Sequence, residues 1–206
     1  GIYNSKTKYP YPPEVMISHD FFMQHTKEFY EFYLDRMVYK EAKPNAAHIA
    51  LAKLESQGRL KAVITQNIDG LHQMAGSKNV FELHGSIYRN YCMKCHKFFD
   101  LDYIINSRGA VPKCDKCGGT VKPDVVLYQE SLDMDIINHS VNYISNADVL
   151  IVGGTSLVVY PAAGLIEYYR GNKLILINKS VTGYDNTADL VINDSIGKVL
   201  GSALKI

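Results

Sequence analysis

Residues 148–156 read DVLIVGGTS, an apolar run followed by two glycines and two hydroxyl side chains. A continuous apolar run without alternation predicts a buried strand, Asp148–Val152, in a parallel sheet covered on both faces. Glycines permit close backbone approach, and exposed N–H groups with two hydroxyls can hold a phosphate or a ribose. Because no G-x-G-x-x-G pattern is present, the segment alone is equally typical of an ordinary β–α turn.

Similar apolar runs lie on either side of this strand, at Leu60–Thr65, Lys173–Ile177 and Leu190–Ile192. Helical patterns lie before and between these runs, from Pro44-Asn45 to Leu54, near Met134–Ile144, and from Pro161 to Tyr169. This alternation predicts an α/β fold with a Rossmann-like, doubly wound parallel sheet. The aromatic-rich stretch Ile17–Tyr39 predicts one or two further helices whose Phe21, Phe22, His25, Phe29, Phe32, Tyr33 and Met37 form core.

The four cysteines form two C-x2-C pairs, Cys92 with Cys95 and Cys114 with Cys117, separated by 18 residues. This spacing predicts a four-thiolate, tetrahedral zinc site without an open position, and therefore a structural zinc. Two disulfides or a redox dithiol are the alternatives. They fit less well in a chain that begins with a polar, proline-rich stretch rather than a secretory signal. We therefore predict an inserted zinc-ribbon module.

The composition excludes several classes of protein. The chain has 206 residues, 47% hydrophobic and 21% charged, which is typical of a globular protein. The net charge of +1 argues against direct nucleic-acid binding, and no apolar run is long enough to span a membrane. We therefore expect a cytoplasmic protein that contacts neither nucleic acid nor membrane.

Polar residues gather where predicted strands end. Gln66, Asn67 and Asp69 follow the strand that ends at Thr65, and His84 precedes a glycine after the next strand-like run. Asn178 follows a strand 24 residues after Gly154, near the place where dinucleotide-binding folds put a ribose-binding residue. Ligands bind at the carboxyl ends of strands in such sheets, so these residues are candidates for the site.

Together, these segments and their order make the sequence similar to the sirtuins, the NAD-dependent protein deacylases. The resemblance covers essentially the whole chain and is closest to a compact bacterial-type member. The matching segments occur in the family's order: TQNIDGLH at 65–72, LHG at 83–85, the two cysteine pairs, KPDVVLYQE at 122–130, GTSL at 154–157, and Ile177-Asn178.

The resemblance implies a role for each matching residue. His84 would be the general base, and NAD would be a consumed co-substrate. The residues implied in NAD binding are Gln66, Asn67, Ile68, Asp69, Gly154, Thr155, Ser156, Asn178 and Ile196. The zinc ligands would be Cys92, Cys95, Cys114 and Cys117.

The resemblance also implies the reaction and the partner. The acyl oxygen of an acyl-lysine protein or peptide would attack the ribose carbon as nicotinamide leaves. The base would then activate a ribose hydroxyl, which takes up the acyl carbon. Water would complete the release of free lysine, and the acyl group would end on ADP-ribose. The peptide would add as a strand between two extended edges, Val125–Tyr128 and Leu157–Tyr160. Its contacts would include Val126, Leu127, Tyr128 and Val159.

The chain departs from the family pattern at its beginning. The family's first strand, Gly-Ala-Gly turn and Pro-Asp-Phe-Arg segment are missing, and Gly1-Ile2-Tyr3-Asn4 matches the sequence just after them. We therefore expect the natural protein to extend upstream. The expected domains are a discontinuous Rossmann-like domain at 46–88 and 121–206, a helical part at 1–45 and a zinc-binding module at 89–120.

Two smaller departures concern the substrate. Tyr128-Gln129-Glu130 stands where the family often has Phe-Gly-Glu. In the best register, the Tyr-x-x-Arg pair of members that remove succinyl or malonyl groups is replaced by Tyr30 and Tyr33. A shifted register would restore the pair as Tyr33 and Arg36, but it needs a gap. Because a tyrosine cannot pair with a carboxylate as arginine does, acetyl is the favoured acyl group.

The main hypothesis is therefore an NAD-dependent protein-lysine deacetylase. ADP-ribosyl transfer to a protein, using the same pocket, is an alternative. So is a non-catalytic module that binds NAD or peptide. A hydride-transfer dehydrogenase lacks its glycine fingerprint here.

Overall fold

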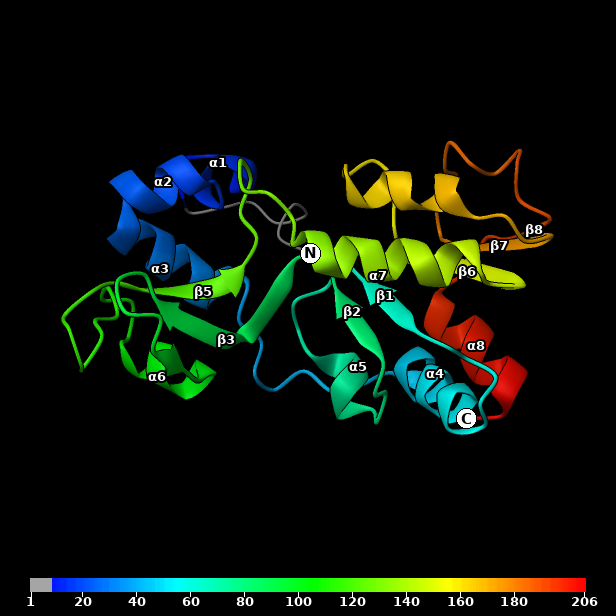
Figure 1. Cartoon of the computed structure of the whole chain (residues 1–206), viewed down its shortest axis with the longest axis horizontal. Coiled ribbons are helices and arrows are strands. Elements are labelled where there is room, and N and C mark those ends of the chain that lie inside the picture. The colour runs from blue at the N-terminus through cyan, green and yellow to red at the C-terminus, as the bar shows by residue number, and fades with distance from the viewer. Residues whose placement is uncertain (1–8) are drawn as a thin grey trace. The chain divides into compact units, whose positions relative to one another are not determined.

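The computed structural model describes residues 9–206, in which the chain forms two compact units (Figure 1). The first unit holds the described residues up to Ala42 together with Asn67–Gly70 and His84–Leu132. The second holds Lys43–Gln66, Leu71–Leu83 and Asp133–Ile206. The motif match at residues 1–4 lies outside the described residues, and the expected domain boundaries stay a prediction.

The second unit contains the parallel strands. Strand β1 (Val63–Thr65) pairs with β2 (Val80–Glu82), and β6 (Val149–Gly153), β7 (Lys173–Ile177) and β8 (Leu190–Ile192) form a second sheet in that order. The predicted parallel α/β fold is confirmed, although its strands form two separate sheets. Its helices are α4 (Ala46–Ser56), α5 (Leu71–Met74), α7 (Met134–Ser145), the 3₁₀ helix η1 (Ala162–Tyr168) and α8 (Ile196–Leu204).

Strand β7 shows why its apolar run is continuous. Ile175 and Ile177 pack in a cluster with residues of α4 and α8, whereas Leu174 and Leu176 pack in another cluster with Leu157 and η1. Alternate side chains of a strand point to opposite faces, so both faces of this strand are covered. That arrangement requires the apolar residues found at positions 174–177.

Helix α4 begins where the sequence predicts. The Asn45 side chain accepts hydrogen bonds from the backbone N–H groups of Ala47 at 2.9 Å and His48 at 3.3 Å. His48 Nδ1 in turn accepts the Asn45 backbone N–H at 3.2 Å, which completes a capping box. Such a cap stabilises a helix by about 1 kcal/mol.

The first unit combines short helices with an antiparallel sheet. Its helices are α1 (Pro13–Met16), α2 (His19–Gln24), α3 (Thr26–Arg36) and α6 (Leu101–Asn106). Its strands are β3 (Gly85–Cys92), β4 (Phe98–Phe99) and β5 (Val121–Val125), in the order β4-β3-β5. The aromatic residues expected as core are buried in this unit, except His25, which is exposed and lines a hollow.

Gly85 explains how β3 and β5 approach each other. It has a φ of +75°, and a Cβ at this position would lie 1.8 Å from the carbonyl oxygen of Asp124 on β5. Only glycine therefore fits directly after His84. Within residues 9–206, none of the helices is long and apolar enough to cross a membrane.

Candidate active site and zinc site

The start of β3 joins two predicted parts of the site within the first unit. The N–H of Ile87 donates to the carbonyl oxygen of Ile68 at 3.0 Å, and the N–H of Val126 donates to the carbonyl oxygen of His84 at 3.0 Å. The segment 67–70 and the segment after β5 therefore lie beside the chain from His84 to Ile87. Backbone bonds thus bring three groups of candidates into one unit: the NAD-binding residues 67–69, the base and the peptide-binding residues.

His84 lies in the two-residue turn between β2 and β3, as the sequence predicts, and it is half-buried. The residue before it is anchored, because the Leu83 N–H donates to the Thr65 carbonyl oxygen at 2.9 Å. The residue after it is a glycine in contact with β5. Within the first unit, the backbone of His84 is therefore held by Gly85 and by the Val126 N–H.

The turn after Asp69 is also tightly held. Gly70 has a φ of +66°, and a Cβ there would lie 2.8 Å from the ring of Tyr88. Asp69 and Ile68 are half-buried, whereas Asn67 is exposed. The polar side chains of this segment therefore sit on a backbone fixed by the Ile68–Ile87 bond and by the Tyr88 ring.

The second unit brings Gln66, Thr155 and Asn178 together. The Thr155 backbone N–H donates to Asn178 Oδ1 at 3.0 Å, and Gln66 Nε2 donates to Thr155 Oγ1 at 3.4 Å. The loop itself turns at Gly154, which has a φ of +66° and whose N–H donates to the Ile177 carbonyl oxygen at 3.1 Å. Three residues predicted to bind NAD thus form one hydrogen-bonded group.

Asn178 carries an unusual feature for a buried residue. It is 8% exposed, and its Nδ2 atom has no hydrogen-bond partner among the described residues. Because Oδ1 accepts from a backbone N–H, the amide orientation is fixed and the unpartnered atom is the donor. A buried donor without an acceptor costs free energy, so this atom fits a site for a ligand oxygen.

The other NAD candidates in this unit have different surroundings. Ser156 and Gly154 are exposed, and Ile196 opens α8. A Cβ on Gly153 would lie 2.4 Å from the Ile196 side chain, so these two residues pack together.

The second predicted peptide edge, residues 157–160, is not extended. These residues form bends and a turn, with a φ of +55° at Leu157, and Val159 is exposed.

The candidate peptide segment is extended beyond β5. Leu127 is buried, Val126 is half-buried and Tyr128 is 39% exposed. Tyr128 forms a parallel bridge with Ser18, and its N–H donates to the Ile17 carbonyl oxygen at 3.0 Å. This bridge ties the segment to the start of α2, a contact for which the sequence offered no signal.

The four cysteine sulfurs form a cluster that fits zinc. All four lie within 4.8 Å of one another, with 3.4 Å between Cys92 and Cys117 and 3.6 Å between Cys95 and Cys114. Tetrahedral Zn–S bonds of about 2.3 Å place sulfurs about 3.8 Å apart, whereas a disulfide requires about 2.05 Å. The donor set therefore fits a closed, structural zinc site rather than two disulfides.

The surroundings of Cys92 favour the thiolate. Burial opposes its ionisation most strongly, but the backbone N–H groups of Cys95 and Lys94 and the neighbouring thiols lower the pKa of Cys92 to about 6. A thiolate is the form that binds metal. Although the Gly119 N–H favours ionisation of Cys117, the neighbouring thiols and burial raise the pKa of Cys117 to about 12.

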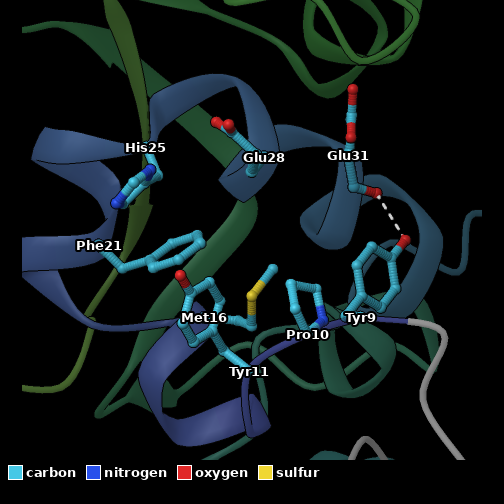
Figure 2. A pocket seen from close by; sticks show the side chains of 8 residues that line it. All are labelled: Tyr9, Pro10, Tyr11, Met16, Phe21, His25, Glu28 and Glu31. Atoms are coloured by element: carbon cyan, nitrogen blue, oxygen red, sulfur yellow. Dashed lines mark hydrogen bonds between the residues drawn. The ribbon is translucent and has the colours of Figure 1, made fainter.

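A separate hollow of about 320 Å³ lies in the first unit and contains none of the predicted site residues (Figure 2). Tyr11 and Phe21 meet edge to face at 5.5 Å, and the Tyr9 hydroxyl donates to the Glu31 carbonyl oxygen at 3.3 Å. The remaining lining residues are Pro10, Met16, His25 and Glu28.

The second unit combines parallel strands, a Gly-Gly-Thr loop and the buried amide of Asn178, which fits a ribose hydroxyl. The first unit carries the cluster of four thiols. Together these features define a nucleotide-binding protein with a structural zinc site. The Sir2 family model matches residues 1–161. The chain therefore belongs to the Sir2 family.

Individual relatives are similar over nearly the whole chain. An NAD-dependent protein deacetylase of Clostridium acetobutylicum is 70% identical over 204 residues, which are 99% of this chain and 83% of the relative. A Sir2 structure with p53 peptide and NAD+ is 40% identical with a TM-score of 0.87, covering 98% of this chain and 85% of its own. A Sir2 structure with a propionylated peptide is 39% identical with a TM-score of 0.87, covering 96% and 85%.

Proposed function

We propose that the protein is an NAD-dependent protein-lysine deacetylase that transfers the acyl group from lysine to ADP-ribose and releases nicotinamide. The observation that carries the proposal is the 70% identity to an NAD-dependent protein deacetylase over 99% of the chain. The backbone bonds from Val126 to His84 and from Ile87 to Ile68, which join the candidate residues within the first unit, support it.

NAD would supply the electrophilic ribose carbon and the ribose hydroxyl that receives the acyl group. His84 would take the proton from that hydroxyl, a task suited to a side chain that titrates near neutral pH. Asn67 and Asp69 would line the nicotinamide pocket, and Asp69 would hold the carboxamide. The remaining NAD contacts would come from Gln66, Ile68, Gly154, Thr155, Ser156, Asn178 and Ile196.

The acyl-lysine peptide would lie along Val126, Leu127 and Tyr128, with Val159 as a further contact. The N–H groups of the first three residues already donate to His84, Glu130 and Ile17. The carbonyl oxygens of Leu127 and Tyr128 already accept from the N–H groups of Glu130 and His19, so the peptide would pair mainly by donating an N–H to the Val126 carbonyl oxygen. Such pairing gives affinity with little dependence on the peptide sequence.

Three further expectations belong to this proposal. Acetyl is the favoured acyl group, since Tyr33 is fully buried in an aromatic cluster and offers no cation for an acidic acyl chain. The division into a Rossmann-like domain, a helical part and a zinc module follows the boundaries given above. A cytoplasmic location is supported by cysteines arranged for a metal, because thiols stay reduced there.

The test is nicotinamide release from NAD by the full-length protein, with acetyl-lysine, succinyl-lysine and unmodified peptides. Release that depends on the acetyl-lysine peptide, with formation of O-acetyl-ADP-ribose, supports deacylation. Release with labelling of protein by ADP-ribose favours ADP-ribosyl transfer instead. NAD binding without release under any condition favours the non-catalytic alternative.

A further inference from the structure

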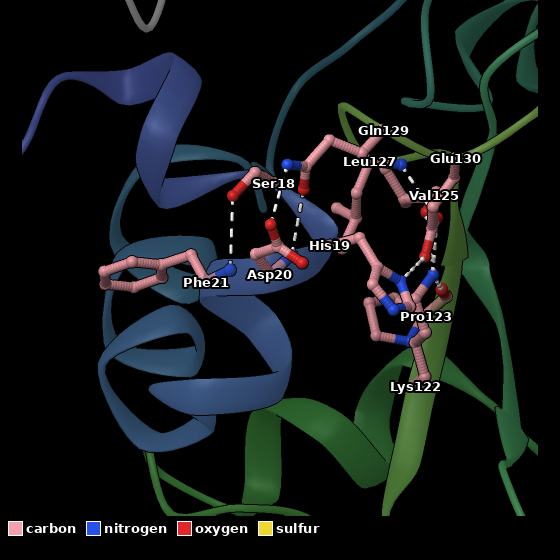
Figure 3. A network of polar contacts seen from close by, with 10 residues as sticks. All are labelled: Ser18, His19, Asp20, Phe21, Lys122, Pro123, Val125, Leu127, Gln129 and Glu130. Carbon is pink, nitrogen blue, oxygen red and sulfur yellow. Dashed lines mark hydrogen bonds and ion pairs between the residues drawn. The ribbon is translucent and has the colours of Figure 1, made fainter.

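The loop Leu127–Glu130 supplies hydrogen-bond partners for the N-terminus of α2 (Figure 3). The N–H of His19 donates to the Tyr128 carbonyl oxygen at 2.9 Å, and the N–H of Asp20 donates to Gln129 Oε1 at 3.0 Å. The first N–H groups of a helix have no partner within the helix. A loop 109 residues away in the sequence therefore caps this helix.

The Gln129 side chain bonds to Asp20 at both ends of its amide. In addition to the bond at Oε1, Gln129 Nε2 donates to Asp20 Oδ2 at 2.9 Å. The backbone N–H of Asp20 can only donate and its carboxylate can only accept, so the amide has one productive orientation. We name these two bonds the Gln129–Asp20 pair.

The backbone of Gln129 explains why the loop needs this pair. Its φ of +76° lies in the left-handed region, which costs free energy for a residue with a Cβ. Glycine would adopt the same φ without that cost. The side chain of Gln129 thus offsets a strain that its own Cβ creates.

Glu130 closes the loop from the other side. Its Oε2 accepts the Leu127 N–H at 2.9 Å and the Lys122 ammonium at 3.0 Å, and its Oε1 contacts His19 Nδ1 at 3.0 Å. The loop is therefore joined to β5 through Lys122 and to α2 through His19. Gln129 is the exposed end of this network, and Glu130 is its half-buried centre.

We propose that Gln129 is a positioning residue for the acyl-lysine peptide. The Gln129–Asp20 pair holds Val126–Tyr128 in the conformation that receives the peptide. This inference rests on the proposed deacetylase function and adds a residue that sets peptide affinity in that site.

Loss of the Gln129–Asp20 pair should change the KM for the peptide. When only a fraction of molecules holds the receptive loop conformation, the apparent affinity for the peptide falls by that fraction. Saturating peptide restores the conformation, so kcat is preserved. Loss of the pair therefore raises KM for the peptide and leaves kcat and KM for NAD unchanged.

The experiment compares four variants of the full-length protein with wild type. Gln129→Ala removes both bonds and keeps the strain. Gln129→Glu places a carboxylate against Asp20. The double variant Gln129→Glu with Asp20→Asn keeps the backbone N–H donating to residue 129 and reverses donor and acceptor in the side-chain bond, so both bonds form. Gln24→Ala, an exposed glutamine of the same helix, is the control.

We expect KM for an acetyl-lysine peptide to rise about fivefold to thirtyfold in Gln129→Ala, as one or two lost hydrogen bonds imply, and at least as much in Gln129→Glu. The double variant should return KM to near the wild-type value, and Gln24→Ala should not change it. An unchanged KM in both single variants, a loss confined to kcat, or a double variant no better than Gln129→Glu would overturn the proposal.

Amide hydrogen exchange separates this inference from the proposed function. Exchange of the Asp20 N–H should accelerate in Gln129→Ala and slow again in the double variant, whether or not the protein turns over. If wild type shows no peptide-dependent nicotinamide release, the proposed function fails and the positioning role fails with it. If turnover is normal but exchange at Asp20 is unchanged, the inference alone fails.

Discussion

Asn178 Oδ1 accepts a hydrogen bond from the backbone N–H of Thr155 at 3.0 Å. This bond joins the residue after β7 to the loop after β6, at the carboxyl ends of two parallel neighbours. It also turns the Nδ2 donor of Asn178 toward a position where no described residue accepts it. The relationship connects the fold of the second unit to the NAD contact proposed for Asn178.

Asn178→Ala removes both the acceptor for Thr155 and the buried donor. We expect KM for NAD to rise about fivefold to thirtyfold, with a smaller effect on kcat. The reason is that one or two hydrogen bonds are lost, namely the bond to the Thr155 N–H and the bond that Nδ2 would donate to NAD. Initial rates at varied NAD and saturating peptide measure this change. Asn138→Ala, on the exposed part of α7, is the matched control. Equal KM values in the two variants would contradict the role of Asn178.

His84→Ala removes the candidate general base. The rate of O-acetyl-ADP-ribose formation should fall by about a hundredfold to ten-thousandfold, the range for loss of a positioned base. The melting temperature should change little, because the backbone bond to Val126 remains. His139→Ala, an exposed histidine of α7, should retain activity. A His84→Ala enzyme with near wild-type turnover would assign the base to another residue.

The zinc site should behave as structural. Purified protein should contain one zinc per chain by atomic absorption, and Cys114→Ser should lower the melting temperature and speed amide exchange in β3 and β5. The reason is that metal binding free energy contributes directly to folding of small metal-bound modules. Lys116→Ala, exposed between two ligands, is the control. Full stability of the metal-free protein would refute a structural role.

Glu130 should make stability depend on acid pH. Burial raises its pKa, but the His19 ring, the Leu127 N–H and the Lys122 ammonium together hold the pKa below the ordinary value of 4.5. Its stabilisation is therefore complete above the unfolded-state pKa and is lost as pH falls through the lower folded-state pKa.

The corresponding measurement is urea unfolding of wild type and Glu130→Gln between pH 7 and about pH 3, a range that spans the ordinary Glu pKa. The difference in free energy of unfolding should be largest near pH 7 and should shrink below pH 4.5. Glu14→Gln, exposed on α1, serves as the control. A difference that stays constant across this range would show that the Glu130 charge contributes nothing.

Much of the fold could be predicted because its signals are local. The bounds of β7 and β8 match the apolar runs in the sequence, and α4 begins after the predicted Asn45. At Pro161–Tyr169 the sequence predicts a helix, and the structure has the tighter 3₁₀ form. Apolar spacing identifies the buried face of a helix, but it does not separate two helical forms over so short a segment.

The candidate site could be predicted only in part. Gln66, Asn67, Asp69, His84 and Asn178 follow strand-like runs, so position along the chain was enough to select them. The bend at 157–160 could not be predicted, because Leu157 adopts a φ of +55° that its side chain does not favour. His19 and Asp20 were not selected, since neither lies near a predicted strand end.

The sequence by itself determined the helices and strands, the cysteine ligands and the family. The reason is that apolar periodicity, C-x2-C spacing and the family motifs depend on residues that lie close together in the chain. Tertiary structure decided which distant residues meet. Gln129 bonds to Asp20 across 109 residues, and Thr155 bonds to Asn178 across 23. No local pattern encodes such pairs. They form because packing places a donor and an acceptor together, and because a polar group left unpaired on folding costs free energy.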